Sequence, residues 1–246
     1  MAIRVLLPQP ILPAGYDFLR EHGYEAVDGR GFTEEDIIAD IAGCDAAIVR
    51  TAKITERILA AAPKLKIVAR HGAGYDGVDL EAARRHGVLV CTAGGANAVS
   101  VAELAIFYML YCSRNFKKVQ ANYLTDYRYA KMGIPKTELE GKTLGLVGLG
   151  HIGKLVAKKA ALGFDMEVLA YDPFAKQEGL PEYIQLVEDR DEIFRRGDYI
   201  SLHVPATQET IHSVSNREFD LMKETAYLIN TARGSIVDES ALVRAL

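Results

Sequence analysis

Three glycines at a fixed spacing, followed by a carboxylate, form the pattern with the clearest chemistry in this sequence. Gly148, Gly150 and Gly153 make G-x-G-x-x-G, and Asp172 follows the last glycine by 19 residues. Glycines so spaced allow a tight turn, close backbone approach to a pyrophosphate, and close packing of helix on strand. The helix N-terminus offers N–H groups to phosphates, and a carboxylate can accept the adenosine-ribose hydroxyls. The pattern predicts a dinucleotide site; a merely structural glycine turn is the alternative.

The elements that must position this turn follow from hydrophobic periodicity. Short apolar segments that alternate with amphipathic ones run through residues 1–98 and start again at residue 143, which predicts two doubly wound parallel sheets in an α/β protein. The expected strands are residues 3–7, 24–27, 46–49, 65–69 and 88–91, then 143–147, 166–171, 184–186, 198–203 and 226–230. The expected helices are residues 14–22, 33–41, 55–62, 79–86, 99–113 and 152–162.

Other candidate residues follow the expected strands directly, where open α/β sheets bind ligands. Arg233 could pair with a carboxylate, or it could be an ordinary surface arginine. The glycines of residues 70–76 could expose successive N–H groups to an anion, or simply form a tight turn. His203 could exchange protons with a substrate, or pack at a strand end.

Composition limits the function classes. The net charge of −4 comes without a basic run, which argues against nucleic acid as a partner. No apolar stretch reaches the roughly 18 residues of a membrane span, and no signal peptide is evident. Cys44, Cys91 and Cys112 are widely spaced in apolar runs, so we expect reduced core thiols in a cytoplasmic protein. No Cys/His spacing suggests a metal site.

Residues 115–141 are too long for a simple connection and are rich in tyrosine. We interpret them as an interface arm; an extended surface loop is the alternative.

Several motifs together resemble one enzyme family. They are IVRT at 48–51, VARHGAGYDGVD at 68–79, SVAE at 100–103, GLGHIG at 148–153, HVPAT at 203–207 and NTARGSIVDE at 230–239. In this order they resemble the D-isomer-specific 2-hydroxyacid dehydrogenases, and most of all the phosphoglycerate dehydrogenase branch.

The resemblance implies two Rossmann-like domains: a flavodoxin-like substrate domain over 1–98 and an NAD-binding domain over 99–246, with 115–141 as a homodimer arm. It implies NAD as cofactor, a small 2-hydroxy or 2-oxo acid as substrate, and Arg233 as the catalytic arginine that holds the carboxylate and polarises the 2-oxo group. The implied substrate-binding residues are Arg50, Arg70, His71, Gly72, Ala73 and Gly74. The implied cofactor-binding residues are Gly148, Gly150, His151, Ile152, Gly153, Asp172, His203, Val204, Pro205, Thr210, Thr231 and Ala232.

The sequence departs from the family pattern in two places. Cys91-Thr92-Ala93 stands where the family usually has Asn-x-Pro. The family also continues beyond the position of Leu246 with a glutamate and a general acid–base histidine, so we expect a shortened chain with an incomplete second domain and impaired turnover. The favoured reaction is the interconversion of 3-phosphoglycerate and 3-phosphohydroxypyruvate. The alternatives are a hydroxypyruvate or glyoxylate reductase and a non-catalytic NAD-binding protein.

Overall fold

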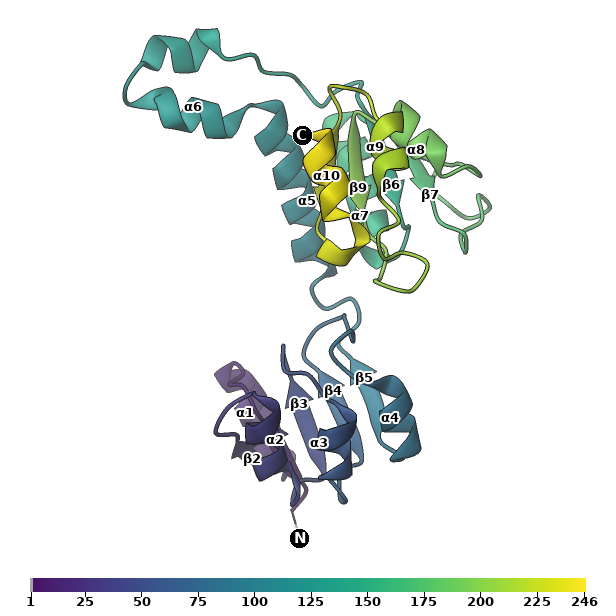
Figure 1. The fold of residues 1–246 in the computed structure, drawn as a ribbon. Coiled ribbons are helices and arrows are strands. Elements are labelled where there is room, and N and C mark those ends of the chain that lie inside the picture. The colour runs from purple at the N-terminus through teal and green to yellow at the C-terminus, as the bar shows by residue number, and fades with distance from the viewer. Residues whose placement is uncertain (1) are drawn as a thin grey trace. The chain divides into compact units, whose positions relative to one another are not determined.

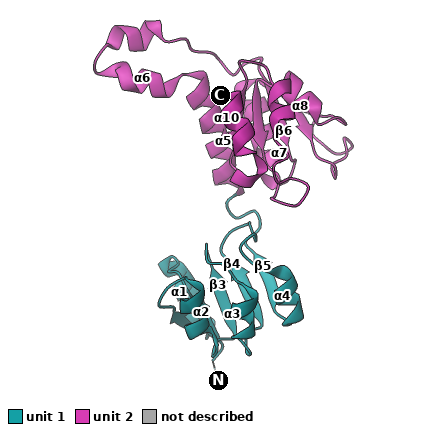
Figure 2. Ribbon diagram, viewed as in Figure 1, with its two compact units in different colours: residues 1–97 teal, residues 98–246 magenta. Residues whose placement is uncertain are grey.

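The computed structural model describes residues 2–246 and separates them between Asn97 and Ala98 into two compact units (Figure 2). Each unit is an α/β fold around its own five-stranded parallel sheet. The expected fold class, two doubly wound parallel sheets, is confirmed. We call the two parts unit 1 and unit 2 and describe each by itself.

Unit 1 contains the strand order β2-β1-β3-β4-β5, which is the flavodoxin-like order (Figure 1). The order reverses at β1, so the switch point lies between β1 and β3. The strands are β1 (Arg4–Leu7), β2 (Glu25–Asp28), β3 (Ala46–Val49), β4 (Ile67–Arg70) and β5 (Leu89–Thr92). The helices are α1 (Pro13–Glu21), α2 (Glu34–Ile41), α3 (Glu56–Ala60) and α4 (Leu80–Arg85).

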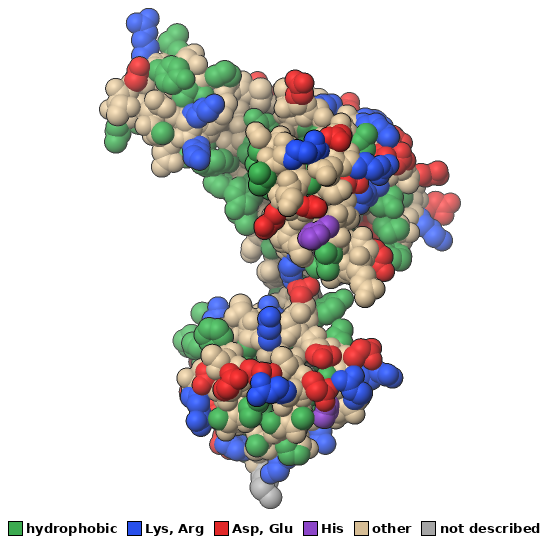
Figure 3. All heavy atoms as spheres, viewed as in Figure 1, with side chains coloured by type: hydrophobic (Ala, Val, Ile, Leu, Met, Phe, Trp, Pro, Cys, Tyr) green, Lys and Arg blue, Asp and Glu red, His purple; other side chains and the backbone are tan. Residues whose placement is uncertain are grey.

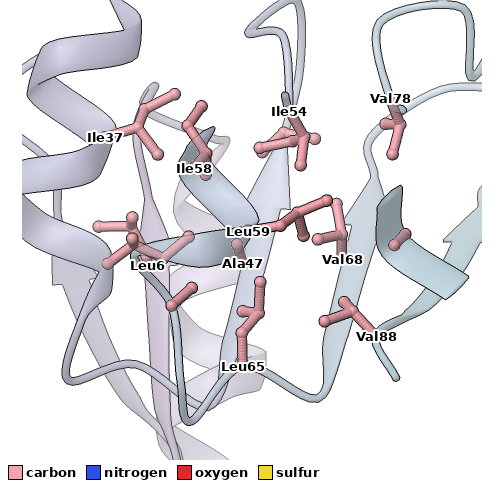
Figure 4. Close-up of a cluster of buried hydrophobic side chains, with 14 of the residues drawn as sticks. Leu6, Ile37, Ala47, Ile54, Ile58, Leu59, Leu65, Val68, Val78 and Val88 are labelled. Carbon is pink, nitrogen blue, oxygen red and sulfur yellow. The ribbon is translucent and has the colours of Figure 1, made fainter. Parts of the chain in front are cut away.

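The core of unit 1 divides between the two faces of its sheet because neighbouring strand residues point to opposite sides. Leu6 joins the larger cluster, in which Ile37 of α2 and Leu59 of α3 also lie (Figure 4). Val5 and Leu7 join a smaller cluster with Leu19 of α1. The sheet is thus held between α1 on one face and α2, α3 and α4 on the other.

Unit 2 contains the strand order β10-β9-β6-β7-β8, which is the dinucleotide-binding Rossmann order. Its switch point lies between β6 and β9. The strands are β6 (Thr143–Val147), β7 (Glu167–Tyr171), β8 (Ile184–Leu186), β9 (Tyr199–Leu202) and β10 (Tyr227–Asn230). The helices are α5 (Ala98–Ser113), α6 (Phe116–Tyr123), α7 (His151–Phe164), α8 (Asp191–Arg196), α9 (Asn216–Leu221) and α10 (Glu239–Ala245).

The structure adds detail to residues 115–141 and corrects the expectation that all three cysteines are core thiols. Residues 115–141 contain α6 and a π-helical turn, Tyr129–Gly133, and these project from the body of unit 2 (Figure 1). The cysteines are all free, as expected, but only Cys44 is buried; Cys91 is exposed and Cys112 is half-buried. Cys91 lies on β5, an edge strand whose side chains are little covered. Within residues 2–246, no helix is long and apolar enough to cross a membrane.

Candidate functional site

The glycine turn of unit 2 connects β6 to α7 at the switch point of the sheet. Gly148 has a φ of +96°, and a Cβ there would lie 2.7 Å from the carbonyl oxygen of His203 at the end of β9. A Cβ on Gly153 would collide with the carbonyl oxygen of Gly148. Around the middle glycine, Gly150, a Cβ would meet no atom within 4 Å. The outer two glycines are therefore required by packing, whereas the middle one leaves the backbone open to a ligand.

The N-terminus of α7 presents backbone donors at this turn. The first amide to find a helical acceptor is that of Lys154, which donates to the carbonyl of Gly150 at 3.0 Å. Gly150 is the N-cap residue and provides no side-chain cap. Among the described residues, the four amides of residues 150–153 have no hydrogen-bond partner. Unpaired amides at the positive end of a 14-residue helix form an anion site.

Asp172 follows β7 and is tied to the glycine turn. Its Oδ2 accepts a hydrogen bond from the amide of Leu149 at 2.8 Å, and its Oδ1 accepts one from the amide of Phe174 at 2.9 Å. Each carboxylate oxygen can accept a second hydrogen bond, so the group can still receive two hydroxyls. Asp172 thus holds the turn in shape while remaining able to bind a ribose.

His203 lies just beyond β9, beneath the glycine turn. Its Nε2 forms a hydrogen bond of 2.9 Å with Oγ of Ser201, which is fully buried. Burial lowers the pKa of His203 to about 4, so the ring is neutral at pH 7. A neutral, tethered ring suits packing better than proton transfer. Of the neighbouring candidates, Val204 touches the position that a Cβ on Gly148 would take, whereas the Thr210 hydroxyl is bonded to the Pro205 carbonyl within its own loop.

The loop after β10 is shaped by Asn230. Its side chain donates to the carbonyl of Arg233 at 2.8 Å and accepts from the amide of Ala232 at 3.0 Å. The half-buried Arg233 donates from Nη1 to the carbonyl of Ala232 at 2.8 Å. Within the described chain, the buried hydroxyl of Thr231 has no hydrogen-bond partner. Because a buried unsatisfied hydroxyl is costly, Thr231 fits a ligand that supplies the missing bond.

Two arginines lie at the carboxyl ends of neighbouring strands of the unit 1 sheet. Arg70 ends β4 and is paired in register with Val49, so Arg50 follows next to it. Arg50 donates from Nη1 to the carbonyl of Pro10 at 3.0 Å, and Arg70 donates from Nη1 to that of His71 at 2.8 Å. In the described part of unit 1 neither has a carboxylate partner. The unit's other arginines all form ion pairs with carboxylates; they are Arg4, Arg20, Arg30, Arg57, Arg84 and Arg85.

The turn after β4 adds backbone donors beside these arginines. The amides of His71 and Gly72 are taken, because they donate to the carbonyls of Val49 and Arg70 at 2.8 Å each. The next three amides, those of residues 73–75, have no partner among the described residues. The part of the turn that could bind an anion therefore begins at Ala73.

Two side chains that shape these strand ends, Asn230 and Gln9, were not among the site residues predicted from the sequence. Gln9 lies between two prolines after β1 and bonds to the loop that contains Arg50. A polar residue between prolines at a strand end was the available signal, but its partners lie more than 40 residues away in the sequence.

Comparisons with known proteins place the chain in a family. Residues 106–246 match the family model described as D-isomer specific 2-hydroxyacid dehydrogenase, NAD binding domain. The D-3-phosphoglycerate dehydrogenase of Methanocaldococcus jannaschii is 37% identical over 246 residues, which are 99% of this chain and 46% of the relative. The hydroxypyruvate reductase of Thermotoga maritima is 41% identical over 211 residues, which are 85% of this chain and 67% of the relative.

A solved structure agrees in fold and cofactor. The NAD-bound 3-phosphoglycerate dehydrogenase of Entamoeba histolytica has a TM-score of 0.83 and 32% identity, covering 99% of this chain and 76% of that one. The chain spans about half the length of the curated phosphoglycerate dehydrogenases that it matches. It belongs to the D-isomer specific 2-hydroxyacid dehydrogenase family, a family of NAD-dependent enzymes, and NAD is the cofactor of its matched domain.

Proposed function

We propose that this protein interconverts a D-2-hydroxy acid and its 2-oxo acid, with 3-phosphoglycerate and 3-phosphohydroxypyruvate as the substrate pair. The observation that carries the substrate is that Arg50 and Arg70, at the carboxyl ends of the neighbouring strands β3 and β4, have no carboxylate partner in the described part of unit 1. A phosphate group would compensate both charges, because guanidinium groups bind phosphate oxygens in a planar, often bidentate way.

The residues of unit 2 suit the cofactor's part of this reaction. NAD would supply the hydride chemistry: the C2 hydride of the 2-hydroxy acid would go to NAD+ while its hydroxyl proton passes to a base or to water, and the reverse reaction would take a hydride from NADH and a proton onto the 2-oxo oxygen. The unpaired amides of residues 150–153 would hold the pyrophosphate, and Asp172 the ribose hydroxyls. The Thr231 hydroxyl would gain the hydrogen bond that it lacks.

Each unit also has a group that could bind a carboxylate: Arg233 in unit 2 and the turn after β4 in unit 1. Arg233 would bind the carboxylate and stabilise the negative charge that develops on the 2-oxo oxygen during reduction. The unpaired amides of residues 73–75 are a second set of donors for a carboxylate.

Ligand titration tests the substrate class directly. The NADH-saturated protein is titrated by calorimetry with D-3-phosphoglycerate, D-glycerate and glycolate at one ionic strength. We expect the phosphorylated acid to bind about tenfold or more tightly than D-glycerate, since hydrogen bonds to charged groups contribute about 1.5–3 kcal/mol. Equal affinities would reject the phosphorylated substrate.

A hydroxypyruvate reductase is the second candidate, supported by the identity to the Thermotoga maritima enzyme. The comparison of NADH oxidation with 3-phosphohydroxypyruvate, hydroxypyruvate and glyoxylate separates the two. A higher kcat/KM for hydroxypyruvate than for its phosphorylated form would favour the reductase.

We further propose that α5, α6 and the π-helical turn form a homodimer interface. Apolar side chains gather on the projecting arm (Figure 3). Those more than 40% exposed include Phe107 and Tyr108 of α5, Phe116 and Tyr123 of α6, and Leu124, Tyr127, Tyr129 and Met132 beyond it. Exposed aromatic residues in one patch are typical of interfaces.

Light scattering at micromolar concentration tests this interface. The parent protein should give twice the monomer mass, and the double variant Tyr123→Asp, Leu124→Asp should give the monomer mass. A monomeric parent protein would refute the dimer.

A further inference from the structure

Gln9 fastens the loop that follows β1 to the loop that follows β3. Its Oε1 accepts hydrogen bonds from the amides of Thr51 and Ala52 at 2.9 and 3.1 Å, and its Nε2 donates to Oγ1 of Thr51 at 2.7 Å. One half-buried side chain thus satisfies two amides and a hydroxyl that lie more than 40 positions away in the sequence.

The side chain of Arg50 adds a further hydrogen bond between the same two loops. Its Nη1 donates to the carbonyl of Pro10 at 3.0 Å, so adjacent residues of each loop bond to the other loop. Pro8 and Pro10 restrict the backbone of the first loop and lack amide donors, and Pro13 begins α1. The Pro10 carbonyl, which accepts the hydrogen bond from Arg50, therefore belongs to a stiff segment. The hydrogen bonds of Gln9 hold this segment next to the second loop.

We infer that Gln9 is a positioning residue for Arg50: it fixes the guanidinium at the switch point of the unit 1 sheet, where Arg50 binds the phosphate of the substrate. This inference rests on the proposed function for the phosphate. Gln9 acts through Arg50, because its Oε1 and Nε2 are already engaged by Thr51 and Ala52. A guanidinium that is held before the ligand arrives loses less side-chain freedom on binding.

The test measures ligand affinity and loop protection in the same variants. Gln9→Leu removes all three hydrogen bonds at similar size, and we expect it to raise the Kd of D-3-phosphoglycerate about tenfold, with D-glycerate changed less than about twofold. In an Arg50→Gln background the same substitution should change the Kd by less than about twofold. Gln177→Leu in unit 2 is the matched control, because Gln177 also bonds two backbone groups, of Ile184 and Leu186.

Hydrogen exchange of the Thr51 and Ala52 amides supplies a readout that needs no ligand. Gln9→Leu should speed their exchange, while Gln9→Glu keeps an acceptor for both amides and should retain their protection. The role of Gln9 is wrong if the parent protein prefers D-3-phosphoglycerate but the Gln9→Leu variant binds it with the Kd of the parent. It is also wrong if Gln9→Leu raises the Kd by the same factor in the Arg50→Gln background as in the parent protein. If the parent protein shows no preference for the phosphorylated acid, the phosphate site fails and the role of Gln9 fails with it.

Discussion

The two units share a doubly wound architecture but have different chemical groups at their switch points. In unit 1 the ends of β1 and β3 carry side chains, Gln9 and Arg50, joined across two loops. In unit 2 the ends of β6 and β9 carry glycines, a tethered histidine and the unpaired amides of α7. At the switch point itself, unit 1 offers the charged side chain of Arg50, whereas unit 2 offers the backbone amides of α7.

The distance along the chain from strand to helix explains part of this difference. In unit 2, β6 ends at Val147 and α7 begins at His151, so the helix N-terminus lies close to the strand end. In unit 1, β1 ends at Leu7 and α1 begins only at Pro13, after a loop with two prolines. A longer, stiffer loop replaces the helix amides with side chains. The same fold therefore supports different recognition chemistry through a few residues at the strand ends.

The largest expected effect concerns the histidine beneath the glycine turn. Burial lowers the pKa of His203 to about 4, below the 6.5 of a free histidine, so the unfolded chain takes up a proton first as the pH falls. Stability is therefore retained above pH 6.5 and is lost between pH 6.5 and 4, by up to about 3 kcal/mol. Hydrogen exchange of the β6 and β9 amides between pH 7 and 4.5 measures it.

Two substitutions sharpen that measurement. His203→Asn should remove most of the pH dependence of the stability of unit 2, even where the substitution lowers that stability at pH 7. His71→Asn, in the exposed turn of unit 1, should follow the parent curve. A His203→Asn curve parallel to that of the parent protein would show that another group is responsible.

A smaller effect is expected from one methyl group in α7. Gly153→Ala should weaken NADH binding roughly 10- to 100-fold, because its Cβ would collide with the Gly148 carbonyl and deform the turn, at a cost of about 1–3 kcal/mol. Gly163→Ala, in the same helix with nothing within 4 Å of the added carbon, should leave binding unchanged and stabilise the helix by about 0.5–1 kcal/mol. Fluorescence titration with NADH compares the two, and equal affinities would place the pyrophosphate elsewhere.

The smallest of these effects is the choice between NADH and NADPH. Asp172 would repel a 2′-phosphate by on the order of 1 kcal/mol, so we expect NADPH to bind several-fold more weakly. Asp172→Asn should not simply reverse this preference, because one oxygen of the carboxylate also holds the Leu149 amide of the glycine turn. We expect the variant to bind both cofactors more weakly than the parent binds NADH; a gain in NADPH affinity would mean that the bond to Leu149 is dispensable.

Local patterns were sufficient for much of the fold and for the cofactor turn. The expected bounds match β3, β6 and β8, and the expected start of α2 near residue 33 agrees with the capping box that Thr33 and Asp36 form. The glycine turn could be predicted because its strand, helix and acid lie within 30 residues. Helix α8, Asp191–Arg196, was not among the expected helices.

Contacts between distant strands could not be read from the sequence. The register of Val49 with Arg70 places Arg50 and Arg70 at the ends of neighbouring strands, and the bonds of Gln9 depend on β1 lying beside β3. The exposure of Cys91 depends on β5 being an edge strand, which the strand's own composition does not reveal.

Backbone amide NMR of the whole chain during two titrations shows whether the carboxyl ends of the two sheets bind different anionic ligands. NADH should shift the amides of residues 148–153 and 172–174, and D-3-phosphoglycerate added to the NADH complex should shift those of residues 50–52 and 70–75. The amide of Gln185 on β8 is the reference, because it belongs to neither of these two groups of residues. A phosphoglycerate titration that leaves residues 50–52 and 70–75 unmoved would contradict the assignment of the substrate to unit 1.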